Sequence, residues 1–508
     1  MMGQTTLNEV EVAVDGRLFN AGLLSGLGEV RVQQRLSLPD QAELSFFDSV
    51  GSLEAIEEFA PGMSLQITSY HRDAAARLFV GEITAVEHIY HANGSYEIQV
   101  RGYDKLHQMR NNQSLRVFEN ATIVGVAEKV AKPYNIKVKG GATRLRWPQV
   151  FQHHQSDLEL LVEMAARDGL YVTLRGGELH LMPHTGIGEA VKLNLRQDLL
   201  EARLEQNSDL SRQRVTASGW DTQFAKAQAS GNAKPSDLQS PARSRESSAA
   251  HWLNESLVDR DQAEALAAAD MQFRRSVART LWGVAVGNPL LRPGTPVELV
   301  GASGASAQRY VLASVIHRMS NQMDYITEID SRLPDPRPRP RGAAITVGIV
   351  TTAQDPKENG RVRVHLPAYG GVESGWLPVL TVGAGQQKGL VMLPAPNDTV
   401  LVLLAYEDPA QGIVLGGLYG TINTPDSGVN AQGQVHRYTW TTPQGQRIQL
   451  DNDDNSVRLE NSGALMGPGS LIDIKDGEIT IKNQAGSYIK LDGDQIIIAG
   501  KAIDFQSL

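Results

Sequence analysis

The C-terminal part of the chain alternates apolar and polar residues with a period of two. Residues 474–505 read IKDGEITIKNQAGSYIKLDGDQIIIAGKAIDF, and four glycines divide this stretch into short pieces. Each piece has the length and the alternation of a strand of about five residues. No helical pattern follows these strands, so their apolar side chains need another surface to pack against.

The same period of two fills the N-terminal part of the chain. Residues 7–110 contain several alternating segments, among them VRVQQRLSL (30–38) and YEIQVRGY (96–103). Alternation of this kind, with turn residues between the segments, predicts a β-rich domain that is either a barrel or a sandwich. Strands return between residues 198 and 331, for example in TPVELVG (295–301).

Three segments have helical spacing instead. Residues 121–131 and 156–169 place apolar residues at intervals of three and four, and residues 261–278 are rich in alanine. Ser156 and Glu159 form a capping-box pair at the start of the second helix, and Gly169 provides a left-handed stop. We therefore expect a small α/β element within residues 104–190.

Two segments are typical of connections. Residues 226–251 are polar and contain few large apolar side chains, which predicts a mobile loop. Residues 334–342 read PDPRPRPRG, and alternating proline favours an extended, stiff spacer between domains.

Composition excludes several classes of function. The chain has 508 residues, 41% of them apolar, and a net charge of −9, which argues against a general binder of nucleic acid or anionic membranes. The absence of cysteine excludes disulfides, thiolate metal sites and a cysteine nucleophile. The sequence has no signal-peptide pattern and no stretch apolar enough to span a bilayer, so we expect synthesis and first assembly in the cytosol.

Taken individually, the candidate catalytic and metal-binding residues give only weak evidence for a site. Asp451, Asp453 and Asn455 resemble the start of a calcium loop, but serine stands at the sixth and twelfth places, so a polar β-turn is the better interpretation. His153 and His154 are adjacent, which favours strand or loop surface over a metal pair. We expect no catalytic residue, no metal site and no cofactor.

A block of short strands at 345–422 carries the most specific pattern. It contains VGIVTTAQDPKENGRVRVHLPAYGG (347–371) and ends in LGGLYG. The block closely resembles the OB-fold domain of VgrG-type spike proteins and of contractile-phage hub and spike proteins. The residues that carry this resemblance, and to which it gives a structural role, are Asp355, Pro356, Gly360, Arg361, Trp376, Asp408, Pro409, Gly416 and Tyr419.

Other segments resemble the same family along essentially the whole chain, except for residues 226–251. The resemblance implies a mostly β protein with two hub β-barrels, an α/β insertion, an OB-fold neck and a C-terminal intertwined trimeric β-helix, or β-prism. The implied boundaries are a first barrel (1–110), the insertion (111–195), a second barrel (196–333) with the mobile loop, a Pro-rich linker (334–344), the OB-fold (345–422) and the spike (430–508).

The resemblance also offers a partner for the apolar faces of the terminal strands. In a homotrimer wound about one axis, inward side chains would meet their symmetry mates and strand edges would pair with neighbouring chains. The alternation alone fits an ordinary antiparallel meander as well, so the trimer comes from the resemblance. The residues expected in the trimer core are Ile472, Ile474, Ile479, Ile481, Ile489, Leu491, Ile496 and Ile498.

The implied function is mechanical and not enzymatic. The homotrimer would be the central spike of a contractile injection apparatus, adapting a hexameric inner tube to a membrane-puncturing needle. Expected partners are the inner tube protein, baseplate proteins, a PAAR-type tip protein that contacts Phe505 and Leu508, and effector cargo. Nucleic acid is not expected, and the target membrane would be touched only transiently. The protein would be made in the cytoplasm, assembled into a contractile particle and delivered outside or into the target cell.

Two other classes of function remain as alternatives. A tail-tip enzyme that degrades peptidoglycan or glycan would need an inserted catalytic domain, and too few residues separate Tyr419 from the terminal repeats to hold one. A glycan- or receptor-binding module would use the outside of the needle or residues 226–251. The sequence does not distinguish a phage, a secretion-system or a free-particle origin, and its moderate size favours a phage-tail-like particle.

Overall fold

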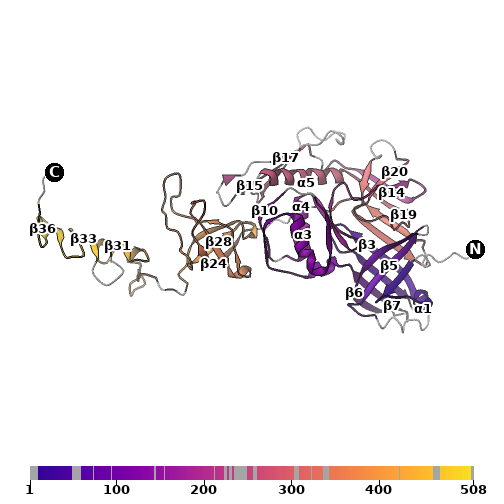
Figure 1. Cartoon of the computed structure of the whole chain (residues 1–508), viewed down its shortest axis with the longest axis horizontal. Coiled ribbons are helices and arrows are strands. Elements are labelled where there is room, and N and C mark those ends of the chain that lie inside the picture. The colour runs from indigo at the N-terminus through magenta and orange to yellow at the C-terminus, as the bar shows by residue number, and fades with distance from the viewer. Residues whose placement is uncertain are drawn as a thin grey trace, which may run out of the picture. The chain divides into compact units, whose positions relative to one another are not determined.

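The computed structural model divides the chain into an N-terminal unit, residues 1–417, and a C-terminal unit, residues 418–508 (Figure 1). No helix in the described part of the chain is long and apolar enough to cross a membrane. The structure describes residues 10–47, 59–71, 74–92, 94–141, 145–153, 155–210, 212–221, 226–227, 231–233, 249–255, 260–302, 308–321, 323–335, 342–420, 422, 424–461 and 469–504.

One eleven-stranded sheet forms the frame of the N-terminal unit. Strand β3 pairs with β22 from Glu29 to Arg35, so residues far apart in the sequence share one hydrogen-bonded wall. The two predicted barrels are therefore joined by a continuous sheet. Its strands, in spatial order, are β14 (Leu199–Gln206), β19 (Arg279–Val286), β23 (Ile326–Asp330), β22 (Ser314–Ser320), β3 (Leu27–Arg35), β4 (Gln41–Phe47), β7 (Tyr96–Tyr103), β6 (Ala74–Tyr90), β5 (Ser64–His71), β1 (Val10–Val14) and β2 (Arg17–Leu18).

Period-two alternation explains the core of this sheet. In β3 the side chains of Val30 and Val32 are fully buried, while Arg31 between them is partly exposed. Met319 and Tyr325 belong to the second barrel region, yet they pack into the same core cluster as β3. The short helix α1 (Ala21–Gly26) precedes β3.

The predicted α/β element is confirmed. Helix α4 (Asp157–Arg167) begins with both hydrogen bonds of the capping box, because Ser156 Oγ accepts from the Glu159 amide and Glu159 Oε2 accepts from the Ser156 amide. Gly169 has a φ of 69°, the left-handed stop that the sequence indicates. The other elements are α2 (Leu106–Asn111), β8 (Arg116–Ala121), α3 (Ile123–Ala131), β9 (Lys137–Gly140), β10 (Trp147–Gln152), β11 (Leu170–Arg175) and β12 (Glu178–Pro183).

The interpretation of residues 226–251 as one loop is wrong at its ends. Strands β16 (Lys226–Ala227), β17 (Gly231–Ala233) and β18 (Ala249–Glu255) all pair with β15 (Arg214–Asp221). A polar segment can pair in this way because the ladder uses backbone groups, which every non-proline residue has. Residues 228–230 and 234–248 lie outside the described residues, and with them most of this prediction.

The predicted alanine-rich helix is confirmed as α5 (Arg260–Ala278). A separate three-stranded sheet contains β13 (Val191–Asn194), β20 (Pro296–Val300) and β21 (Arg309–Val311). A further sheet of six strands closes the N-terminal unit around a core that includes Val350, Val364 and Val402. Its strands are β24 (Ala344–Thr352), β25 (Arg361–Leu366), β26 (Val372–Glu373), β27 (Leu377–Pro378), β28 (Thr399–Leu404) and β29 (Gly412–Gly417). Residues 336–341 of the expected linker lie outside the described residues.

The C-terminal unit is a meander of seven antiparallel strands, each hydrogen-bonded to the next along the chain (Figure 1). Tight turns separate most of them, and Gly477, Gly486 and Gly493 have positive φ in three of these turns. The strands are β30 (Arg437–Thr441), β31 (Gln446–Asp451), β32 (Ser456–Asn461), β33 (Ser470–Lys475), β34 (Glu478–Lys482), β35 (Tyr488–Asp492) and β36 (Gln495–Ala499).

Candidate functional site: the apolar face of the C-terminal sheet

Each strand of the C-terminal meander carries two apolar side chains at alternate positions, and the strand register aligns them. Ile472 lies opposite Ile481, Ile481 opposite Ile489, and Ile489 opposite Ile498. Two columns therefore run across all seven strands on one face of the sheet, which we call the apolar face. One column is Trp440, Ile448, Leu459, Ile472, Ile481, Ile489 and Ile498; the other is Tyr438, Leu450, Val457, Ile474, Ile479, Leu491 and Ile496.

The apolar face is open to solvent in a single chain. Trp440 is 57% exposed, Ile481 is 47% exposed and Ile496 is 71% exposed. Among the described residues of the C-terminal unit there is no helix, and the meander is the single sheet. A continuous apolar surface of this kind marks an interaction site, because leaving it in water is unfavourable.

The eight residues expected in a trimer core all lie on this face. Sequence reasoning placed the core residues from Ile472 onwards and missed the same two columns on β30, β31 and β32, although the alternation in RYTWT, RIQL and SVRL carries the same signal. Phe505 and Leu508, expected to contact a tip protein, lie outside the described residues.

The opposite face of the sheet is mostly polar, apart from Leu471, Tyr488 and Ile497, and it carries ion pairs. Arg458 Nη2 lies 3.0 Å from Asp473 Oδ2 on the neighbouring strand. Lys490 Nζ lies 3.0 Å from Glu478 Oε1 and 2.9 Å from Asp492 Oδ2. These hydrogen bonds to Asp492 and Glu478 raise the pKa of Lys490. The charges keep this face suited to water, so the two faces of the sheet differ sharply.

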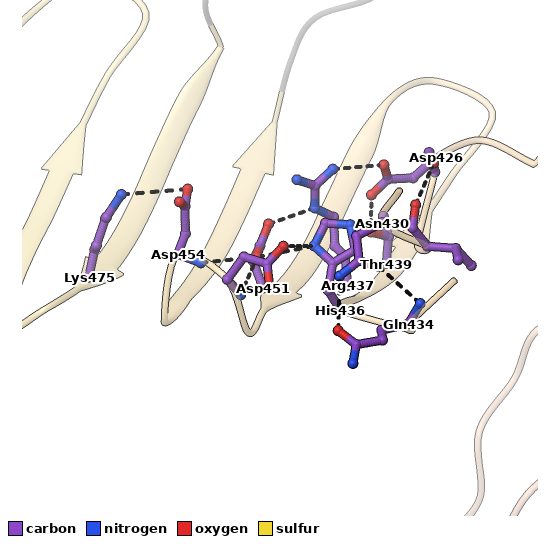
Figure 2. A network of polar contacts seen from close by, with 12 residues as sticks. Asp426, Asn430, Gln434, His436, Arg437, Thr439, Asp451, Asp454 and Lys475 are labelled. Atoms are coloured by element: carbon purple, nitrogen blue, oxygen red, sulfur yellow. Dashed lines mark hydrogen bonds and ion pairs between the residues drawn. The ribbon is translucent and has the colours of Figure 1, made fainter. Parts of the chain in front are cut away.

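A polar network holds the first hairpin of the meander together (Figure 2). Arg437 donates from Nε to Asp451 Oδ2 over 2.7 Å and from Nη1 to Asp426 Oδ1 over 3.1 Å. Hydrogen bonds from Thr439 and Arg437 hold the pKa of Asp426 below its ordinary value, and Arg437 does the same for Asp451. The network thus fixes the segment before β30 to the turn after β31.

The same hairpin gathers His436, Asp451 and Asp453, whose possible ligand atoms lie within 4.8 Å of one another. His436 Nδ1 is 2.8 Å from Asp453 Oδ2. Asp451 Oδ1 accepts from the amides of Asp453 and Asp454, and its Oδ2 accepts from Arg437, so both of its oxygens are already engaged. We assign this cluster to the hydrogen-bond network. The calcium-like start of the sequence folds as a polar turn, as the sequence indicates.

A buried ion pair organises the first turn of the six-stranded sheet. Arg361 donates from Nε and Nη2 to the two oxygens of Asp355, over 2.9 and 2.7 Å, and both side chains are 3% exposed. Asp355 also accepts from the amides of Lys357 and Asn359, and with Arg361 they hold its pKa far below the ordinary range. The guanidinium carbon of Arg361 lies 6.0 Å from the ring centre of Trp376.

The other residues singled out in this block lie in turns and at strand ends. Gly360 has a φ of 68° between Asp355 and the start of β25, where the left-handed backbone favours glycine. Pro356 follows Asp355 directly in that turn. Asp408 Oδ1 accepts from the Ala410 amide over 2.9 Å, in the turn that contains Pro409. Gly416 is opposite Leu401 in the β28–β29 ladder, and Tyr419 is 57% exposed in the C-terminal unit.

The interpretation of His153 as a surface residue is wrong. Its side chain is 5% exposed, and its ring centre lies 5.3 Å from that of Tyr369. It is buried because β10 and the segments around 369 and 408–411 pack together here. His154 lies outside the described residues.

A match to a protein family decides what kind of protein this is. Residues 33–323, more than half of the chain, match the phage tail baseplate hub (GPD) family. The chain belongs to this baseplate hub family. Residues 346–419 also match the type VI secretion system/phage-baseplate injector OB domain. The resemblance seen in the sequence is therefore confirmed, and the six-stranded sheet is the OB domain of this hub protein.

Solved structures with the same fold come from phage tails and secretion systems. The VgrG complex with PdpA from Francisella matches with a TM-score of 0.57 and 10% identity, covering 98% of this chain and 89% of that one. The Escherichia coli c3393 protein, a component of the type VI secretion system, matches with a TM-score of 0.52 and 14% identity, over 80% and 99%. A prophage 43 kDa tail protein from Shewanella oneidensis matches with a TM-score of 0.50 and 16% identity, covering 65% of this chain and 99% of that one.

These likenesses confirm the mostly β fold class. No curated protein matches the chain. The family makes this protein a baseplate hub, and its fold is similar to those of the Francisella VgrG complex and the Escherichia coli secretion-system component.

Proposed function

We propose that three copies of this hub protein pack their apolar faces together and form the central spike of a contractile injection apparatus. The observation that carries the proposal is the pair of apolar columns, which cross seven strands and have no cover within the described residues of one chain. Three sheets around one axis cover all the columns at once. A side chain such as Ile481 gains about 1.5–3 kcal/mol when it passes from water to full burial.

The trimer would make the C-terminal unit a stiff rod. Seven short strands give fourteen inward side chains in each chain, and edge strands of one chain would pair with those of the next. The polar face, with Arg458, Asp473 and Lys490, would stay in water. A rod of this kind is suited to puncturing a membrane, because bending it would require many contacts between the three chains to break at the same time.

The N-terminal unit would connect this rod to the rest of the apparatus. Three copies of the two linked barrel regions offer six barrel-like modules, which suits docking on a hexameric inner tube. Baseplate proteins would surround the hub, a PAAR-type tip protein would cap the end of the rod, and effector cargo would travel with it. Because the family consists of structural hub proteins, we assign a mechanical role and no enzymatic one. The protein would reach the outside or the interior of the target cell on contraction.

A pair of matched double variants tests the proposal. Ile481→Asp with Ile496→Asp places two charges on the apolar face, where burial without a partner is costly. Thr480→Asp with Gln495→Asp places the same charges on the polar face of the same two strands. We expect the first pair to abolish a heat-resistant trimer on gels and in light scattering, and the second to leave it intact. Equal behaviour of the two double variants would contradict the proposal.

A further inference from the structure

The N-terminal unit contains a cleft that the spike function does not use. It has a volume of about 360 Å³, many times the roughly 10–15 Å³ that a cavity needs to hold one water. The C-terminal half of α5, the start of β19, strand β21 and the segment after β23 all contribute to it. Its lining residues include His184, Arg275, Arg279, Arg309, Val311 and Leu333.

The cleft is basic although the chain as a whole is acidic. Three arginines line it, Arg275, Arg279 and Arg309, and none of the described lining residues is Asp or Glu. The whole chain carries 57 acidic and 48 basic residues. Burial, and then the charge of Arg275, lower the pKa of His184 from its ordinary value, so the arginines supply the positive charge at neutral pH.

Among the described residues, the charges of Arg279 and Arg309 are only partly compensated. Arg279 donates to the neutral Gln308 over 3.2 Å. Arg309 lies 3.8 Å from Glu298, and both side chains are about half exposed, so water weakens this pair. Arg275 is in the last turn of α5, where the negative end of the helix dipole favours a cation. Arg309 is on strand β21, so the helix dipole does not account for its charge at this position.

Apolar side chains stand beside the arginines. Tyr310 and Leu333 are buried at 4% and 3% exposure, and Val311 is partly exposed in the wall. The cleft therefore offers guanidinium groups for carboxylates and an apolar surface beside them. A nucleic acid fits less well, since Tyr310 is too buried to stack on a base and the net charge of −9 repels a long polyanion.

From this combination we infer that the cleft binds an acidic peptide segment of a partner protein, with its carboxylates on Arg279 and Arg309 and an apolar residue against Val311. Guanidinium groups bind carboxylates through two parallel hydrogen bonds, which gives direction as well as attraction. The inference does not depend on the trimeric spike, because every lining residue belongs to the N-terminal unit of one chain.

Fluorescence anisotropy on the full chain tests the inference. The probe is a short fluorescein-labelled peptide that alternates glutamate and leucine, and its counterpart replaces glutamate by glutamine. We expect saturable binding of the acidic peptide alone, weakening as salt rises. Arg279→Glu with Arg309→Glu should weaken this binding at least about tenfold, because it removes two charge-assisted contacts.

The control is Arg203→Glu with Arg260→Glu, which changes the charge equally at two exposed arginines that also have acidic neighbours, Glu201 and Glu264. It should bind the peptide as the unchanged protein does. If the charge reversals in the cleft lower the thermal transition, Arg279→Gln with Arg309→Gln replaces them and should still weaken binding. Absence of saturable binding, equal loss in control and cleft variants, or tighter cleft-dependent binding of a single-stranded DNA oligonucleotide would each overturn the inference.

Discussion

Two sheets of this hub protein use the same alternation of apolar and polar residues and differ in what covers the apolar side. In β3 of the N-terminal unit, Val30 and Val32 are fully buried within one chain. In β34 of the C-terminal unit, Ile481 remains 47% exposed. The alternation therefore tells which face of a strand is apolar, and the surrounding fold decides whether that face is covered within the same chain.

The largest expected effect comes from placing a charge in the covered sheet. Val32→Asp puts a carboxylate into a fully buried site without a partner, which should cost several kcal/mol, on the order of 4 or more, and unfold the N-terminal unit. Circular dichroism and thermal denaturation measure this loss. Ile481→Asp should leave that unit's transition in place and act on assembly, so the same change in both variants would remove the distinction between the sheets.

Breaking the buried pair of the OB domain should have the next largest effect. Arg361→Met leaves Asp355 buried without its cation, a change that costs about 3–5 kcal/mol in comparable buried pairs. Urea denaturation followed by tryptophan fluorescence would measure it. Arg363→Met is the matched control, because Arg363 pairs with Glu373 on the surface and its loss should cost less than about 1 kcal/mol. Similar costs for both variants would contradict the assigned role of Arg361.

The two units should also respond to pH in opposite directions. Burial raises the pKa of Asp104 in the N-terminal unit well above its ordinary value and raises that of the neighbouring Asp40 from 3.8 to about 7, so the folded state favours the protonated carboxyl of Asp40. Stability from this group is present at pH below 3.8 and falls as the pH rises towards 7. Asp40→Asn should flatten this part of the pH profile of the N-terminal transition. An unchanged profile would show that Asp40 is not its source.

In the C-terminal unit, the carboxyls of Asp426 and Asp451 have pKa values below the ordinary value. Hydrogen bonds from Arg437 favour the charged form of Asp451, so their contribution is present above pH 3.8 and is lost as the pH falls below that value. Arg437→Met should remove this acid sensitivity and lower stability by about 1–3 kcal/mol at neutral pH. Hydrogen exchange of the first hairpin would measure the change. Protection that is identical at neutral pH in variant and original protein would contradict the role of the network.

Local signals in the sequence predicted local structure well. Ser156, Glu159 and Gly169 act through groups within one helix, so their capping bonds and left-handed stop could be inferred from spacing. The alternation in the terminal repeats likewise placed the eight residues expected in the trimer core, the first of them Ile472 and the last Ile498, on one face. Period and capping are properties of neighbouring residues, and the chain alone determines them.

Contacts between distant segments could not be inferred in this way. The β3–β22 pairing brings Val30 opposite Met319, and nothing in either strand specifies its partner. Residues 226–251 looked like a single loop because side-chain polarity says nothing about backbone pairing, yet β16, β17 and β18 lie at its ends. The cleft arginines stand on α5, β19 and β21, so only the fold shows that they share one site.

An electron-microscopic reconstruction of the full-length protein tests the central claim most directly. We expect a particle of three chains, each of 55.2 kDa, in which residues 437–499 form a shaft with threefold symmetry. Ile472, Ile481 and Ile489 of the three chains should meet at its axis. A single chain whose apolar columns stay in solvent, or fold back onto its own N-terminal unit, would contradict the account.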